Sequence, residues 1–248
     1  MAGRILYIEA PDGISGDMTL GALIDLGVNA DEIKHELNKI IPGEYSFTAR
    51  PFERNGIHGI NLDVAVAEEY GHGHRHYKDI KAMIECGGIS DRAKSYALAI
   101  FDVIAEAEAA VHQVAKDDIA FHEVGAMDSI IDIVGTAIAI DILDVTEFYC
   151  SAPRDGSGSI ECRHGLIPVP VPAVMKMAEG AGIPIVIESD VSTEMITPTG
   201  FGIIKGLGAI FEPCLGIVPE KTGYGFGKRD TGRLGAVRVT LGTKYEGE

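Results

Sequence analysis

Several features are scarce in this sequence of 248 residues. Its four cysteines, Cys86, Cys150, Cys162 and Cys214, lie far apart without a CxxC pair. This spacing excludes a small disulfide scaffold and a zinc ribbon, and it favours reduced thiols. No apolar run approaches the roughly 20 residues that span a bilayer, and the apolar run at the start is too short for a secretory signal. We therefore predict a cytoplasmic protein with no membrane partner.

Positive charge is also scarce. The chain has 21 Lys and Arg against 37 Asp and Glu, which gives a formal net charge of −16. Such a surface repels phosphodiester backbones and attracts cations, so we expect no nucleic-acid partner. Residues 221–238 are an exception, because basic side chains there outnumber the single acid Asp230. A local anion site is predicted in that stretch.

The hydrophobic pattern predicts an α/β fold with a mixed sheet and packed helices. Residues 4–10 are typical of a strand, residues 11–17 of a glycine loop and residues 18–26 of a helix. Asn55-Gly56 favours a hairpin turn between strands at 45–53 and 57–67. Further helices are predicted at 31–40, 79–86, 91–114 and 127–143, and further short strands at 121–124, 183–187 and 237–241. Because no repeat or linker interrupts the chain, we expect one compact unit over 1–248.

The predicted helix at 127–143 is apolar on almost every side but carries Asp128 and Asp132 one turn apart. That spacing places both carboxylates on one face, where they repel unless a cation or a proton lies between them. With His122 and Glu123 directly before the helix, the four residues are candidates for a divalent-metal site or an acid/base pair. The alternative is that Asp128 only caps the helix, which leaves Asp132 unexplained.

Imidazole and thiol side chains form two further candidates for metal binding. His72, His74 and His76 alternate in a predicted loop, where several rings could converge on nickel, copper or zinc. The alternative is an exposed polar loop that happens to be rich in histidine. Cys162 and His164 could bind nickel or act as a nucleophile and its base, or they could be a buried thiol and a hydrogen-bonded imidazole.

Two loops are candidates for binding a cofactor phosphate. In the first, Asp12, Ser15, Gly16 and Asp17 precede a helix start and suit a phosphate bridged by a metal, or they serve only the turn and the helix cap. In the second, residues 223–229 form a glycine-rich loop whose Lys228 and Arg229 could contact a mononucleotide phosphate. Since this loop lacks the GxxxxGK[ST] pattern, no NTPase is indicated. Thr197-Pro198 is predicted to start a helix, with Thr197 as its N-cap.

These motifs together resemble the nickel-pincer cofactor nickel insertase family. The segments at 7–18, 72–76, 121–135, 164–172 and 197–200 occur in the order seen in that family and cover most of the chain. The resemblance implies binding of Ni²⁺ and its insertion into pyridinium-3,5-bisthiocarboxylic acid mononucleotide. It further implies a lactate racemase-type enzyme as recipient, and a reaction that depends on CTP with Mg²⁺ or Mn²⁺.

The sequence departs from the family pattern in two places. Its His-rich loop is short, and it stops near Tyr245, where full-length members continue into a C-terminal domain with the CTP site. The resemblance therefore implies an N-terminal metal-binding domain that turns over poorly without a separate CTP-binding polypeptide. A homo-oligomer is compatible with the sequence. Two competing hypotheses are a non-catalytic nickel-binding or delivery module and a metal-dependent hydrolase of unknown substrate.

Overall fold

A computed structural model describes residues 3–41, 45–66, 75–121, 124, 126–162 and 165–245. Strand β1 (Arg4–Glu9) leads through a glycine loop into helix α1 (Gly16–Asp25), as predicted. Helix α2 (Ala30–Leu37) follows, and the Asn29 side chain caps it by accepting a hydrogen bond from the Asp31 amide at 2.8 Å. The helix is shorter than predicted, because the Ile40 amide bonds back only three residues, to the Leu37 carbonyl, which ends the α-helical pattern.

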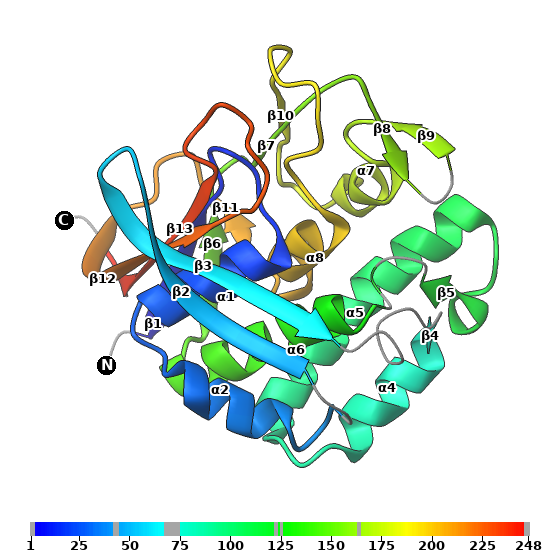
Figure 1. Ribbon diagram of the computed structural model, residues 1–248, viewed down its shortest axis with the longest axis horizontal. Coiled ribbons are helices and arrows are strands. Elements are labelled where there is room, and N and C mark those ends of the chain that lie inside the picture. The colour runs from blue at the N-terminus through cyan, green and yellow to red at the C-terminus, as the bar shows by residue number, and fades with distance from the viewer. Residues whose placement is uncertain are drawn as a thin grey trace.

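The predicted hairpin is confirmed. Strands β2 (Tyr45–Arg54) and β3 (Ile57–Val66) pair antiparallel along their full length. Asn55 and Gly56 join them with φ values of 55° and 76°, the left-handed pair that a tight hairpin turn requires. This hairpin crosses the front of the molecule as two long ribbons (Figure 1).

The central sheet is mixed, as predicted. Its order among the described strands is β11-β6-β1-β13-β12-β3-β2. The strands not yet introduced are β6 (Glu147–Cys150), β11 (Ile210–Phe211), β12 (Ile217–Phe226) and β13 (Ala236–Lys244). β1 pairs parallel with β6 and antiparallel with β13, so the first and last long strands of the sequence lie side by side.

The predicted glycine loop at 223–229 is wrong for its first residues, because β12 continues to Phe226. Its glycines allow close packing here and do not form a turn. A Cβ atom on Gly223 would lie 2.3 Å from the Ala22 carbonyl oxygen, and one on Gly225 would lie 1.8 Å from that of Met18. Helix α1 therefore packs its backbone directly on β12.

Further helices pack around α1 and α6 (Met127–Leu143), which contact the central sheet. They are α4 (Tyr77–Cys86), α5 (Asp91–His112), α7 (Pro172–Ala178) and α8 (Pro198–Gly206). α1 packs against both the sheet and α6, and α5 packs against α6, α7 and α8. The prediction that α6 lies inside the fold is confirmed, since Ile130, Ile131 and Val134 are fully buried. Among the described residues, no helix is both long and apolar enough to cross a membrane.

Short elements complete the chain. A 3₁₀ turn occupies Lys116–Asp118, and the described residues also form three two-stranded pairs outside the central sheet (Figure 1). These pairs are β4 (Arg75–His76) with β5 (Ala120–Phe121), β7 (Arg154–Asp155) with β10 (Val186–Ile187), and β8 (Ser159–Cys162) with β9 (Gly165–Pro168). The predicted strand at 183–187 is therefore real only in its last two residues, where β7 supplies a partner.

Candidate functional site

The N-terminal ends of α1, α6 and α8 lie around one region of the molecule. The loop before α1 is hydrogen-bonded to the segment before α8, because the Ile14 amide donates to the Met195 carbonyl at 2.9 Å and the Thr197 amide donates to the Ile14 carbonyl at 3.0 Å. The first amides of a helix point outward and carry partial positive charge. A region shared by three helix starts is therefore favourable for anions.

The start of α8 follows the sequence prediction. Thr197 is the N-cap, and its Oγ1 accepts a hydrogen bond from the Gly200 amide at 3.1 Å. Pro198 occupies the first helical position, where its missing N–H is not needed. The Thr197 and Thr199 hydroxyls lie 2.9 Å apart, so a pair of hydroxyl groups marks this helix start.

A cavity of about 200 Å³ lies between these three helix starts. We call it the helix-start cavity, and it is lined by Ser15, Gly16, Asp17, Val64, Asp128, Asp132, Thr197, Thr199 and Lys228. A second cavity of about 180 Å³ adjoins it, shares Ser15, Asp17, Thr197 and Lys228, and adds Asp12 and Arg229. Each volume exceeds the roughly 30 Å³ that one water molecule occupies in the liquid, so there is room for a hydrated cation or a phosphate group.

Asp132 is the most unusual side chain in the helix-start cavity. Its Oδ1 is enclosed and has no hydrogen-bond partner among the described residues. α1 begins directly against it, because a Cβ atom on Gly16 would lie 2.7 Å from the Asp132 Cβ and 2.9 Å from its Oδ2. Burial raises the pKa of Asp132 well above its usual range, and the nearby Asp17 and Asp128 raise it further, while Lys228 opposes them. This carboxylate needs a proton or a cation beside it.

The other two carboxylates of the cavity are hydrogen-bonded to the backbone at the start of their own helices. Asp128 is exposed, and its Oδ1 accepts a hydrogen bond from the Ser129 amide at 2.8 Å. Ala126, not Asp128, is the N-cap residue of α6. In α1, the Asp17 Oδ1 accepts a hydrogen bond from the Met18 amide at 2.9 Å and another from the Ser15 hydroxyl. Contacts at the helix starts thus explain in part why Asp17 and Asp128 are present, but they do not explain Asp132.

The basic residues between 221 and 238 are largely paired with carboxylates. Lys228 Nζ lies 3.3 Å from an oxygen of Asp63 on β3. Arg229 lies 3.5 Å from a carboxylate oxygen of Glu194 and also donates to the backbone carbonyl of Glu194 at 2.6 Å. The remaining pairs are Arg233 with Glu188 and Asp190, and Arg238 with Glu9. These pairs reduce the positive charge that an anion would meet, so Lys228, which lines both cavities, is the main cation of the candidate site.

Asp12 makes a structural contact that the sequence did not predict. Its Oδ2 accepts a hydrogen bond from the Gly235 amide at 3.2 Å, which ties the loop after β1 to the segment before β13. This contact gives Asp12 a structural role between two distant segments, and the residue also lines the adjoining cavity.

Five of the predicted site residues, His72, His74, His122, Glu123 and His164, lie outside the described residues. Of the three alternating histidines, only His76 is described, and it is exposed directly before α4. In the described part of the chain, no group of three or more His, Cys, Asp or Glu side chains is arranged to hold a metal ion. The carboxylates around the helix-start cavity therefore do not form a ready-made cage.

Asp155 positions the segment that carries Thr197, and the sequence analysis did not identify it. Its side chain is completely buried, and its Oδ1 accepts hydrogen bonds from the amides of Gly156, Met195 and Ile196 at 2.8, 2.7 and 3.1 Å. Burial raises the pKa of Asp155, while the three amides oppose that rise. The carboxylate thereby anchors the segment that carries Thr197. Nothing in the sequence around Asp155 signals this long-range contact.

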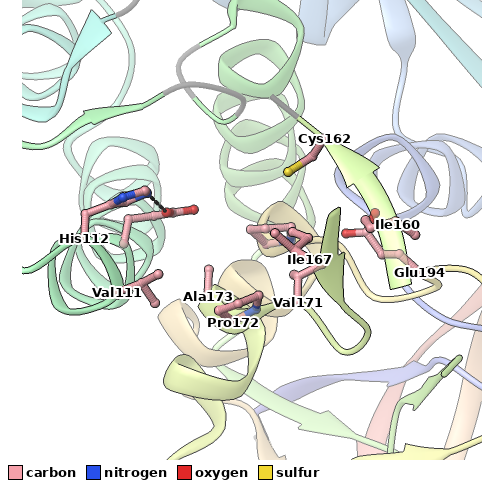
Figure 2. Close-up of a pocket in the computed structure, with 11 residues that line it drawn as sticks. Val111, His112, Ile160, Cys162, Ile167, Val171, Pro172, Ala173 and Glu194 are labelled. Carbon is pink, nitrogen blue, oxygen red and sulfur yellow. Dashed lines mark ion pairs between the residues drawn. The ribbon is translucent and has the colours of Figure 1, made fainter. Parts of the chain in front are cut away.

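Cys162 lies in a separate, mainly apolar pocket of about 180 Å³. This Cys162 pocket is lined by Glu108, Val111, His112, Ile160, Cys162, Ile167, Val171, Pro172, Ala173, Glu194 and Pro198. Figure 2 shows Cys162 and His112 on opposite sides of it. The His112 Nε2 lies 3.5 Å from the Glu108 carboxylate, one helical turn away on α5. The sequence analysis missed His112 and Glu108, because the pattern of α5 indicated only a packed helix.

The fold and the cavity define an α/β protein whose polar site is built from three helix starts, carboxylates and one lysine. A family model described as nickel insertion protein matches residues 6–248, so the chain belongs to that family. This finding confirms the resemblance drawn from the ordered motifs.

Individual relatives agree. The chain is 46% identical to the pyridinium-3,5-bisthiocarboxylic acid mononucleotide nickel insertion protein of Acetivibrio thermocellus, over 99% of this chain and 62% of the relative. It is also 46% identical to the protein of the same name from Lactiplantibacillus plantarum, over 96% of this chain and 61% of the relative. A putative nickel insertion protein of a Cyanothece species is 41% identical, over 97% and 60%. The chain thus spans about three fifths of the length of these relatives. No solved structure matches it significantly.

Proposed function

We propose that this chain binds Ni²⁺ and takes part in its insertion into pyridinium-3,5-bisthiocarboxylic acid mononucleotide, which matures the nickel-pincer cofactor of lactate racemase-type enzymes. The names of the two relatives with 46% identity support the substrate. The observation that carries the reaction centre is the Oδ1 of Asp132, which is enclosed beside Asp17 and Asp128 and has no hydrogen-bond partner in the described part of the chain. Such a group is costly to bury unless a cation or a proton compensates it.

The helix-start cavity suits the phosphate end of a mononucleotide. Three helix starts and Lys228 favour an anion, while Asp17, Asp128 and Asp132 favour a cation. Both preferences are met when a phosphate and a divalent cation bind together. Ser15, Gly16 and Thr197 would then face the phosphate. Asp12 and Arg229 would complete its surroundings from the adjoining cavity.

The donor set also fits a hard divalent cation. Mg²⁺ and Mn²⁺ prefer oxygen ligands, and Mg²⁺ is commonly held by one or two carboxylates together with phosphate and water. Asp128 and Asp132 would hold such an ion, which would neutralise charge on the phosphate. We propose that CTP itself binds to a separate CTP-binding polypeptide.

Nickel capture is proposed for the softer ligands. His72, His74 and His76 would bind Ni²⁺ through imidazole nitrogens, and Cys162 with His164 would supply a thiolate and a further imidazole. His122 and Glu123 would work with Asp128 and Asp132 at the start of α6. In this division of roles, metal uptake and cofactor maturation depend on different residues.

An insertion assay tests this division. We expect the variant with both Asp128→Asn and Asp132→Asn to take up nickel like the original protein but to lose cofactor maturation, measured by activation of a lactate racemase-type enzyme with CTP and the CTP-binding polypeptide present. Asp118→Asn is the matched control, since Asp118 is exposed in the 3₁₀ turn after α5. Retained maturation in the double variant would instead indicate a nickel delivery module. Full activity without the CTP-binding polypeptide would contradict its proposed requirement.

A further inference from the structure

Helix α6 carries two enclosed side-chain oxygens that have no hydrogen-bond partner among the described residues, namely Asp132 Oδ1 and Thr136 Oγ1. The two residues are four positions apart, so their side chains lie on the same face of the helix. One oxygen belongs to a carboxylate, which accepts hydrogen bonds, and the other belongs to a hydroxyl, which can donate one. Each group is costly to bury alone, and each supplies what the other lacks.

The direction of side chains along a helix brings these two groups toward each other. Helical side chains lean toward the N-terminal end, so Thr136 leans over the turn that carries Asp132, and Asp132 leans toward the helix-start cavity. The Asp132 Oδ2 lies against Gly16, which lines that cavity, whereas Oδ1 is enclosed. A cation in the cavity would therefore meet Oδ2, which leaves Oδ1 to be satisfied from within the protein.

Thr136 does not have the usual role of a buried helical threonine. Such a hydroxyl commonly donates to a backbone carbonyl one turn earlier in its own helix. Thr19 on α1 does this, because its hydroxyl donates to the Ser15 carbonyl at 2.8 Å. Thr136 is equally buried, but its hydroxyl makes no such bond to the described residues. Within residues 133–140 it is the only polar side chain, so its hydroxyl is available to Asp132.

We propose that Thr136 is a positioning residue of the cation site, whose hydroxyl donates a hydrogen bond to the enclosed oxygen of Asp132. Rotation about the Cα–Cβ bond of Thr136, or one buried water, bridges the two oxygens. A hydrogen bond to a charged carboxylate is stronger than one between neutral groups, so it holds Asp132 with its other oxygen toward the cavity. Thr136 itself does not touch the cation. This inference rests on the proposed function, because it assumes a divalent cation beside Asp132.

Calorimetric titration with Mn²⁺ tests the role of the hydroxyl. Thr136→Val nearly keeps the shape of the side chain and removes the hydroxyl, while Thr136→Ser keeps the hydroxyl. Thr240→Val is the matched control, because Thr240 is also buried but lines neither polar cavity. We expect Thr136→Val to weaken Mn²⁺ binding by about tenfold or more, the usual effect of losing a hydrogen bond to a charged group. Thr136→Ser should stay within about threefold of the original protein, and Thr240→Val within about twofold.

A double-mutant cycle in the metal-free protein separates this contact from general packing. Urea unfolding measures the effect of Thr136→Val in the original protein and in a protein that already carries Asp132→Ala, whose side chain has no oxygen to accept the bond. We expect Thr136→Val to destabilise the original protein and to have little effect beside Asp132→Ala. Circular dichroism checks that each variant is folded.

Three results would overturn the inference. In the first, Thr136→Val binds Mn²⁺ like the original protein. In the second, Thr136→Ser binds Mn²⁺ as weakly as Thr136→Val does. In the third, Thr136→Val costs the same stability with and without Asp132. Failure of the proposed function has a different signature, because the original protein would then bind no Mn²⁺ while the cycle still showed coupling between Asp132 and Thr136. That result would keep the hydrogen bond and remove the cation site.

Discussion

At the scale of single residues, Asp132 distinguishes this site from an ordinary helix start. The partial positive charge of a helix start explains acidic residues in the first turn, and Asp17 and Asp128 each accept a hydrogen bond from a first-turn amide there. Asp132 lies one turn further into α6, where its enclosed Oδ1 gains nothing from the end of the helix. A protein keeps such a group at a cost in stability, which is typical of functional sites.

This cost predicts an unusual pH dependence. Because the native pKa of Asp132 is raised above the ordinary value of 3.8, the folded protein holds a proton that the unfolded chain releases. The stabilising contribution of the protonated Asp132 is thus complete below the ordinary pKa of 3.8, and it is lost as the pH rises through the native pKa. We expect metal-free Asp132→Asn to be more stable than the original protein at neutral pH, by on the order of 1–3 kcal/mol. The variant should also lose less stability than the original protein as the pH rises.

Urea unfolding of metal-free protein between about pH 5 and pH 8 measures this effect. Asp118→Asn, at an exposed position, should keep the pH dependence of the original protein. If Asp132→Asn were less stable than the original at every pH, Asp132 would instead be a stabilising hydrogen-bond partner, and the assignment would be wrong.

At the scale of elements, the candidate site depends on how helices begin. The starts of α1 and α8 are joined through Ile14 and Thr197, and Asp155 anchors the segment between β10 and α8. Each contact is local to a helix end, yet together they set the geometry of the cavity. Loss of a single cap should therefore affect both stability and binding.

Thr197 allows this dependence to be measured. We expect Thr197→Ala to lower the free energy of unfolding by about 1 kcal/mol, the usual cost of losing a hydroxyl N-cap, and to weaken phosphate binding in the cavity. Thr197→Ser keeps the hydroxyl that accepts from the Gly200 amide and should retain most of both. Equal losses in the two variants, measured by urea unfolding and phosphate titration, would show that the methyl group rather than the cap is important.

Elements were predictable where local rules decide them. Helix α6 was predicted with its observed bounds because apolar residues occupy almost every side of it, and the β2–β3 hairpin was predicted because Asn55-Gly56 tolerates positive φ. β12 was misread, since Gly223 and Gly225 favour a turn in isolation. In the folded chain they are required by the close approach of α1, which is a tertiary effect that no local pattern contains.

At the scale of the whole molecule, the candidate site is assembled from distant parts of the chain. Helical spacing alone could place Asp128 beside Asp132, and one loop contains Ser15 and Asp17 together. Folding adds Val64 from the hairpin, Thr197 from α8 and Lys228 from the turn after β12. The sequence analysis identified most of these residues as candidates, but it could not predict that they line one cavity. It missed the Asp155 anchor entirely, because that contact spans about 40 residues.

The net charge of −16 makes the whole molecule favourable for cations, but it does not select a place for one. The central claim is that a divalent cation joins the carboxylates of the helix-start cavity. Mn²⁺ is a suitable probe because it prefers oxygen ligands and depends less on the histidines than nickel does.

Thermal unfolding of the original protein and of Asp132→Asn, each with and without Mn²⁺, tests this claim most directly. We predict that Mn²⁺ raises the Tm of the original protein in a concentration-dependent way, since an ion that binds only the folded state stabilises it. Asp132→Asn should show almost no such rise, although its metal-free Tm is at least as high as that of the original protein. An equal rise in Tm for both proteins would contradict the claim.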